Sequence, residues 1–232
     1  MSIILALDSS GDVFSAALST PRGAATPHTD YVYREQHGRA QAACALPLIT
    51  DLLTKQNYTL EDCDAFAFAA GPGKFSALRL VCTLARSFAY AHNKPLLAVP
   101  SFAALAQANY GAQQLTVKCT LPAQQQHVYF AVCSNLAGTW QVDKTTLHNC
   151  NLPLPAAAVQ HACGAGYQSY PQILNQETLT TTAVYSNAAA VWQLAASMLA
   201  NNEVSEPLTC KPFYLRDKIA ETVYQRNARK HC

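Results

Sequence analysis

The chain has 232 residues, and its 16 Lys and Arg together with 14 Asp and Glu make up only 13% of them, against about 25% in an average soluble domain. This length allows one large domain or two smaller lobes, and either can bury a sizeable core without disulfides or a structural metal. The net charge of +2 excludes the strong positive field of a protein that binds nucleic acid on its own, so any contact with RNA is expected to be shared with a partner.

The first half of the chain alternates strand-like and helix-like patterns. Two apolar runs on either side of a polar turn predict a β-hairpin. Later apolar runs predict further strands, whereas apolar positions three to four residues apart predict helices. Pro47 lies inside the first helical stretch and is expected to kink it. The expected strands are 3–8, 13–19, 30–34, 64–70 and 96–99, and the expected helices are 39–56 and 77–92.

The second half alternates less regularly. Strands are expected at 115–120, 127–133, 139–147 and near 183–185. A helix is expected from an N-cap at Ser186 through about Leu199, because a serine side chain accepts hydrogen bonds from the first turn. The order of elements predicts an α/β protein with two lobes, joined by a linker near residues 100–110. From Arg216 onward five basic residues outnumber two acidic ones, which predicts a basic, solvated tail.

The helix expected at 77–92 is more apolar than a helix that covers one face of a sheet. Eleven of the fifteen residues from Ala77 to Ala91 are apolar. Seven of them spread over about 200° of the helix, whereas a helix on a sheet needs a stripe of roughly 100°. These seven are Leu78, Leu80, Val81, Cys82, Leu84, Ala85 and Phe88. Either the helix at 39–56 or a partner protein covers the remainder, since large exposed apolar patches are rare on monomers. The low charge of the chain favours a docking face.

Two polar segments follow strands of the first half and are candidates for binding phosphate. Gly71-Pro72-Gly73-Lys74 is not a P-loop, because Phe68 and Phe75 stand where that motif requires Gly and Ser or Thr. A strand, a Gly-rich turn and a helix N-terminus remain, which either bind an anion or simply turn the chain. Asp8-Ser9-Ser10 ends the first strand, where folds of the actin and sugar-kinase type hold Mg²⁺ and phosphates; a turn-forming aspartate is the alternative.

The other polar residues form no catalytic or metal-binding pattern. The seven histidines have no short ligand spacing, and no two of the nine cysteines are closer than 13 residues, which excludes zinc ribbons and Cys-x-x-Cys redox sites. Scattered thiols in apolar stretches are typical of small buried side chains in a reducing compartment. No signal peptide and no run of about 20 apolar residues is found. We therefore expect a soluble, cytoplasmic protein with no catalytic residue, no metal and no cofactor.

Several motifs, in order along the chain, resemble the TsaB (YeaZ) family, the bacterial partner subunit in making threonylcarbamoyladenosine in tRNA. The most specific is Ala70-Gly-Pro-Gly-Lys-Phe-Ser-Ala-Leu-Arg79. The others are the opening Ile-Leu-Ala-Leu-Asp8-Ser-Ser, His37 followed by Leu46-Pro47, Val99-Pro-Ser101, Val128-Tyr129, Gly164-Ala-Gly166-Tyr167 and Pro212-Phe-Tyr214-Leu215-Arg216. The resemblance runs from residue 3 to about 220 and so covers nearly the whole chain.

The resemblance implies an actin-like ATPase/sugar-kinase fold with two RNase-H-like lobes, at residues 1–105 and 106–232. In the family, the two helices of the first lobe pack against the same helices of the catalytic paralogue TsaD, or of a second TsaB copy, as a four-helix bundle. The residues that would form this interface are Ala42, Leu46, Ile49, Leu53, Leu78, Val81, Leu84, Ala85 and Phe88.

The chain departs from both patterns at several positions. TsaD has a His-x-x-x-His metal motif, whereas the matching stretch here runs from His37 to Gln41. Lys74, Ser76 and Ala77 replace Ser, Thr and Gly of the usual TsaB motif Gly-Pro-Gly-Ser-Phe-Thr-Gly-Leu-Arg, and Pro122-Ala123-Gln124 replaces the usual Asp-Ala-Arg. This protein therefore does without whatever that Asp and Arg do in the family.

Two functions of different classes follow. The first is a non-catalytic subunit that docks TsaD as a heterodimer, stabilises its competent conformation and helps to form the surface that meets the ATPase subunit TsaE and tRNA. In this hypothesis tRNA binds only within the complex, and the chain alone is a homodimer. The alternative is an enzyme, either a glycoprotease-like peptidase or an actin-fold ATPase or kinase. In that ATPase or kinase, Asp8, Ser9, Ser10, Gly71, Gly73 and Lys74 would hold the nucleotide.

Overall fold

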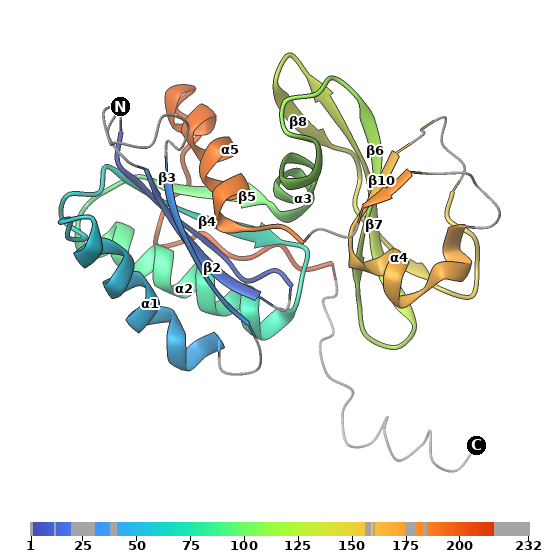
Figure 1. The fold of residues 1–232 in the computed structure, drawn as a ribbon, viewed down its shortest axis with the longest axis horizontal. Coiled ribbons are helices and arrows are strands. Elements are labelled where there is room, and N and C mark those ends of the chain that lie inside the picture. Colours follow the sequence, from blue (N-terminus) through green and yellow to red (C-terminus); the bar gives the residue numbers. More distant parts are fainter. Residues whose placement is uncertain are drawn as a thin grey trace, which may run out of the picture.

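A computed structural model describes residues 2–11, 13–19, 31–37, 41–155, 159, 161–174, 180–182 and 185–215 of the chain. The strands of this part form two sheets, one in each half of the molecule (Figure 1). The expected basic tail at 216–232 and residues 183–184 of the strand expected near 183–185 lie outside the described residues. No helix of the described part is long and apolar enough to cross a membrane.

The first sheet has the strand order β3-β2-β1-β4-β5. Its strands are β1 (Ile4–Asp8), β2 (Val13–Ser19), β3 (Tyr31–His37), β4 (Ala65–Gly71) and β5 (Leu96–Pro100). β1, β4 and β5 are parallel, whereas β2 is antiparallel to both β1 and β3. The carboxyl ends of the parallel strands therefore meet at one edge, which brings the end of β1 beside the glycine-rich turn after β4.

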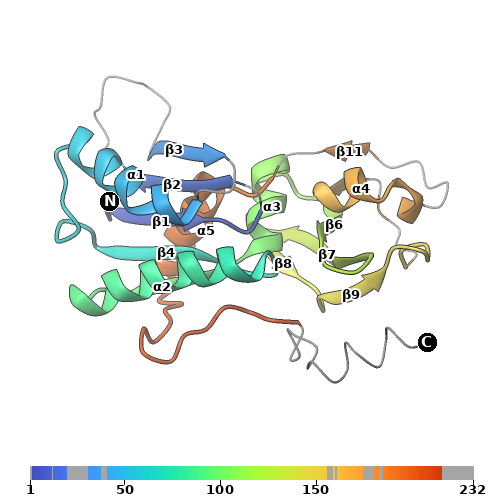
Figure 2. The same cartoon turned by 90° about the horizontal axis from the view of Figure 1, so that it is seen from below.

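The two faces of this sheet carry side chains of different size. In β4, Phe66 and Phe68 point to one face and Ala65 and Ala67 to the other, as the two-residue period of a strand requires. The large side chains pack under two helices that lie side by side, and the alanines pack under an alanine-rich helix (Figure 2). These helices are α1 (Gln41–Lys55) and α2 (Phe75–Ala91) on the first face, and α5 (Ala188–Ala200) on the second.

Residues 101–110, expected as a linker, instead form helix α3 (Ser101–Tyr110). The helix lies between the two sheets (Figure 1), and its side chains from Ser101 to Ala106 are almost fully buried. A helix surrounded by protein has no polar face, so its sequence lacks the periodicity that reveals an amphipathic helix. Gly111 follows it with a φ of +56°, a conformation that glycine adopts without strain.

The second sheet has the order β11-β10-β6-β7-β8, and β9 pairs with another part of β7. Its strands are β6 (Thr116–Pro122), β7 (His127–Leu136), β8 (Thr139–Val142), β9 (Thr146–Asn149), β10 (His161–Cys163) and β11 (Thr180–Thr182); the short helix α4 (Ala165–Ser169) and a 3₁₀ turn, Pro171–Leu174, follow β10. The single strand expected at 139–147 is thus two strands, β8 and β9, because both pair with the long strand β7 at different registers.

After the second sheet the chain returns to the first. The expected division between residues 105 and 106 places α5 in the second lobe, but α5 packs against β1, β2, β4 and β5. Its N-cap is Asn187, whose side chain accepts a hydrogen bond from Ala190 N at 3.0 Å, and not Ser186. We therefore call β1 to β5 with α1, α2 and α5 the first lobe, and β6 to β11 with α4 the second lobe.

Candidate functional site

The residues that follow β1 contact the glycine-rich turn between β4 and α2. Lys74 N donates a hydrogen bond to Ser10 O at 3.3 Å. A Cβ atom on Gly73 would lie only 2.7 Å from the same oxygen, so a residue with a side chain does not fit there. Gly71 N donates to Ser101 Oγ of α3 at 2.9 Å. The turn is therefore fixed by the end of β1 on one side and by α3 on the other.

The polar side chains at the end of β1 are directed into the protein. Asp8 is 1% exposed, and its carboxylate accepts hydrogen bonds from Ser10 N, at 2.7 Å, and from Ser186 Oγ. Burial raises the pKa of Asp8 above its ordinary value, and the hydrogen bonds from Ser186 and Ser10 oppose this rise. The buried Ser9 hydroxyl donates to Gln41 Oε1 at 3.0 Å. Asp8 and Ser9 therefore hold α5 and α1 in place.

The structure divides the six residues expected to hold a nucleotide between a buried group and two cavities. Asp8, Ser9 and Ser10 are buried, and the side chains of the first two bond within the chain. Of the six expected residues, Gly73 and Lys74 line a cavity that opens between the two lobes, and Gly71 lines a second cavity. Among the described residues, no group of three or more His, Cys, Asp or Glu side chains is arranged to hold a metal ion.

Asp8→Asn is expected to keep the fold, and Asp8→Ala is expected to weaken it. Asparagine can accept from Ser10 N and donate to Ser186 Oγ without burying a charge, whereas alanine leaves both groups without a partner, at about 1–3 kcal/mol of unfolding free energy. Because the pKa of Asp8 is raised in the folded state, its contribution to stability is complete below the ordinary value of 3.8 and is lost as the pH rises through the raised value.

Urea unfolding at a series of pH values measures this effect. As the pH rises above the ordinary value of 3.8, the wild-type protein is expected to lose stability relative to Asp8→Asn, because the aspartate ionises in a buried site and asparagine does not. A difference between the two proteins that stays constant with pH would contradict a raised pKa at Asp8.

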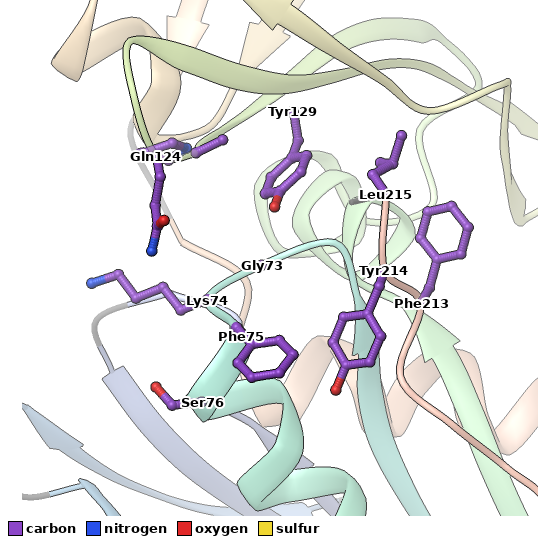
Figure 3. Close-up of a pocket in the computed structure, with 11 residues that line it drawn as sticks. Gly73, Lys74, Phe75, Ser76, Gln124, Tyr129, Phe213, Tyr214 and Leu215 are labelled. Carbon is purple, nitrogen blue, oxygen red and sulfur yellow. The ribbon is translucent and has the colours of Figure 1, made fainter. Parts of the chain in front are cut away.

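A cavity of about 440 Å³ opens between the lobes beside the glycine-rich turn after β4. The start of α2, the segment after β6, and residues 213–215 line it. Figure 3 shows Lys74 of the first lobe and Gln124 of the second extending toward each other, with Tyr129 pointing into the space between the lobes. The rings of Phe75 and Tyr214 lie 5.1 Å apart on a third side.

The chemistry of this cavity suits an anion with a flat apolar part. α2 is 17 residues long, and the side chain of its N-cap residue, Lys74, makes no capping hydrogen bond. The first N–H groups of the helix can therefore face an anion. The aromatic rings that line the cavity supply surfaces on which a flat group can stack. We call this cavity the interlobe pocket.

The face of α1 and α2 is the second candidate site, and the structure corrects its extent. Of the nine residues expected to contact a partner, five are at most 6% exposed; they are Ile49, Leu53, Leu78, Val81 and Ala85. Four of these pack between the helices and the sheet, and Leu78 lies beside the turn at Gly71. They are core residues of this chain because the helices cover their own sheet with the inner part of the apolar arc.

The outer part of the arc remains available. On α1, Ala42 is exposed and Leu46 is 52% exposed; on α2, Leu84 and Phe88 are half-buried. Tyr90, which sequence reasoning did not single out, is 65% exposed near the end of α2. Its place in the helical period, seven residues after Thr83, puts it on the polar side of the arc and is the signal that could have found it.

A segment from the end of the chain covers another flank of α2. Arg86 Nε donates to Pro207 O at 2.6 Å, and Arg86 Nη2 donates to Leu208 O at 2.8 Å. Residues 205–215, which we call the C-terminal strap, run along α2 in Figure 2. Part of the wide apolar arc is thus covered within the chain, by residues more than 100 positions away that no local pattern links to α2.

The chain is similar to known proteins along most of its length. Residues 32–224 match the family model described as TsaD: tRNA N6-adenosine threonylcarbamoyltransferase. The tRNA threonylcarbamoyladenosine biosynthesis protein TsaB of Haemophilus influenzae is 26% identical over 228 residues, covering 93% of this chain and 94% of that protein. The protein of the same name from Escherichia coli K12 is 25% identical, covering 94% of this chain and 96% of its own length.

A solved structure agrees with these matches. YeaZ from Pseudomonas aeruginosa has a TM-score of 0.80 to this chain at 28% sequence identity, covering 93% of this chain and 100% of that one. The resemblance to TsaB that the motifs indicate is therefore confirmed. The predicted α/β fold of the actin-like, RNase-H-like type is confirmed as well.

Proposed function

The chain belongs to the TsaD family, whose members are described as tRNA N6-adenosine threonylcarbamoyltransferases, and from this premise we propose that it is the TsaB subunit of the machinery that forms threonylcarbamoyladenosine in tRNA. It acts in the cytoplasm, by docking the catalytic paralogue TsaD. The observation that carries this proposal is its similarity to proteins named TsaB along 94% and 96% of their length.

The first lobe supports a subunit without chemistry of its own. Asp8 stands where folds of this type place the acid of the phosphate site, but its carboxylate is bonded to Ser10 and Ser186. Gln41 stands where the metal motif of TsaD has its second histidine, and it accepts a hydrogen bond from Ser9. Both positions serve to hold helices against β1. In this proposal TsaD transfers the threonylcarbamoyl group. TsaE binds the surface that the two subunits form together, and tRNA binds only to the complex.

The outer face of α1 and α2 supports the docking. Leu46 of α1 is 52% exposed, and half-buried Leu84 and Phe88 provide apolar surface on the neighbouring helix α2. Two helices that lie side by side can pack against two helices of a partner as a four-helix bundle. In the absence of TsaD, the same face pairs with a second copy of this chain, which gives a homodimer.

Reconstitution tests the proposed function. TsaD, TsaE, tRNA and the threonylcarbamoyl donor are combined with and without this chain, and the modified nucleoside is measured by mass spectrometry. We expect the product only when the chain is present, and light scattering is expected to give the mass of one chain with one TsaD. An equal yield without the chain contradicts the proposal. Product formed by the chain without TsaD contradicts its non-catalytic part.

One observation favours a second function, that of a nucleotide-binding ATPase or kinase. The interlobe pocket places Lys74 and the start of α2 near the rings of Tyr129 and Tyr214, a combination that suits the phosphates and base of a nucleotide. Calorimetry with ATP and Mg²⁺ on the isolated chain separates the two functions. Binding with a Kd of about 1 μM that is lost in Lys74→Ala would support the enzyme. The subunit proposal predicts no heat of binding.

A further inference from the structure

The C-terminal strap is attached to the first lobe at points that lie on both sides of a cysteine. Before that cysteine, Arg86 binds the carbonyl oxygens of Pro207 and Leu208, and after it, Phe213 N donates to Ala70 O at 2.6 Å. Cys210 lies between these anchors and packs against the core cluster that contains Cys82 of α2. The Cys82 and Cys210 side chains are close enough for each to shift the pKa of the other. The strap therefore holds Cys210 against Cys82.

The two thiols have different surroundings. Cys82 is 2% exposed and lies one helical turn before Arg86, whereas Cys210 is half-buried. The hydrogen bond from Cys82 lowers the pKa of Cys210 to about 7, with smaller contributions from Ser205 and the Arg86 guanidinium, while burial opposes them. The same hydrogen bond, together with burial, raises the pKa of Cys82. Because Cys210 is the more exposed of the two thiols and has the lower pKa, it is the nucleophile of the pair.

We propose that Cys210 is a peroxide-sensitive thiol, and that its oxidation joins the C-terminal strap to α2 through a Cys82–Cys210 disulfide. This modification site is independent of the proposed docking of TsaD. Reactive thiols are typically partly exposed and lie next to a cation, and redox-sensor cysteines often have a second cysteine within reach. Cys210 meets each condition, with Arg86 as the cation and Cys82 as the second cysteine.

The chemistry requires a peroxide as the oxidant. The Cys210 thiolate attacks one oxygen of hydrogen peroxide; the S–O bond forms as the O–O bond breaks, and the hydroxide that leaves takes up a proton to become water. The Cys82 sulfur then attacks the sulfenic acid of Cys210, which forms the S–S bond and breaks the S–O bond. The proton of Cys82 goes to the second hydroxide. Two thiols lose two electrons, and one peroxide becomes two waters.

The disulfide would act on the interlobe pocket through the strap. Phe213, Tyr214 and Leu215 line that pocket and follow Cys210 by only a few residues. In the reduced protein the strap is held to the first lobe by hydrogen bonds, which can open one at a time. A covalent bond to α2 keeps the whole segment closed and so fixes one wall of the pocket.

A second thiol pair in the chain provides a matched control. Cys119 and Cys163 have their sulfur atoms 3.5 Å apart, on the neighbouring strands β6 and β10, but both are 0% exposed. Burial raises the pKa of Cys119 well above its ordinary value of 9.0. At pH 7 a thiol with a pKa of about 7 is half ionised, whereas one with a pKa of 9.0 is about 1% ionised, a ratio of about 50. Proximity alone predicts oxidation of both pairs; the proposal predicts it only at Cys82–Cys210.

Peptide mass spectrometry of the full-length protein tests the proposal. The protein is treated with hydrogen peroxide at pH 7, free thiols are blocked with N-ethylmaleimide, and the digest is compared with and without reduction. We expect a Cys82–Cys210 cross-link that reduction reverses, with Cys119–Cys163 oxidised at least about 50-fold more slowly. In Cys82→Ser, whose fold is checked by circular dichroism, dimedone is expected to trap the sulfenic acid of Cys210.

The pH profile gives a readout that does not depend on a variant. The rate at which N-ethylmaleimide labels Cys210 in the wild-type protein is expected to fall by half as the pH drops to about 7, because the thiolate is lost there. Equal oxidation of both thiol pairs, or a Cys210 that oxidises without linking to Cys82, overturns the proposal. So does a Cys210 that resists peroxide altogether.

Discussion

Gly164→Ala is expected to destabilise the protein by about 4 kcal/mol or more, a loss that few single substitutions reach. Gly164 lies between β10 and α4 with a φ of +111°, where a side chain is strained by about 1–3 kcal/mol. A Cβ atom at this position would also overlap Thr120 O of β6 and lie 3.0 Å from Leu105 Cδ2 of α3. Neither neighbour can move away, because β6 is an inner strand of the second sheet and Leu105 of α3 is fully buried.

Gly138→Ala is the matched control for this prediction. Gly138 lies in the turn between β7 and β8 with a φ of +87°, and a Cβ atom there would meet nothing within 4 Å. Only the conformational strain of about 1–3 kcal/mol applies. Urea unfolding of the two variants separates strain from overlap. If Gly164→Ala lost no more stability than Gly138→Ala, the close contact between Gly164 and Thr120 of β6 would be contradicted.

Among the helices, an apolar period can be read from the sequence where one face of the helix lies on a sheet and the other in water. The helices at 41–55 and 75–91 have that asymmetry, and their apolar period shows it. Helix α3 has none, because protein surrounds it, so its ten residues were expected to be a linker. The return of α5 to the first sheet could not be predicted for another reason: its alanines fit either sheet, and only the alanine face of β4 selects one.

The sequence allows one to predict that the ends of two strands meet, but not the direction of the side chains there. The end of β1 and the glycine turn after β4 do meet, because parallel strands bring their carboxyl ends together. The direction of the Asp8 side chain depends on Ser186, which is 178 residues away, and no local pattern contains that partner. The sequence favoured a docking face for the wide apolar arc of α2, because the segments that cover part of this arc are also distant in the sequence. Its inner part covers the sheet, and the strap covers one flank.

Leu46→Glu is expected to weaken association with TsaD by about 10- to 100-fold. Burying a leucine at an interface is worth about 1.5–3 kcal/mol, and each 1.4 kcal/mol changes an association constant about tenfold. Leu46 is 52% exposed, so glutamate there leaves the fold of the chain itself intact. A charge at Val81 could not make this distinction, because Val81 is 0% exposed and its substitution would disrupt the core.

Leu136→Glu is the control, since Leu136 is 56% exposed and ends β7 in the second lobe, away from α1 (Figure 1). Both variants add one negative charge at a similarly exposed leucine, so equal weakening in calorimetry would show a general effect of charge. Weakening by Leu46→Glu alone places TsaD on α1, whereas full affinity in both places it elsewhere. If the isolated chain pairs through the same face, light scattering should also find Leu46→Glu monomeric at concentrations where Leu136→Glu is a dimer. The two partners would then compete for one surface, and TsaD could bind only after the homodimer separates.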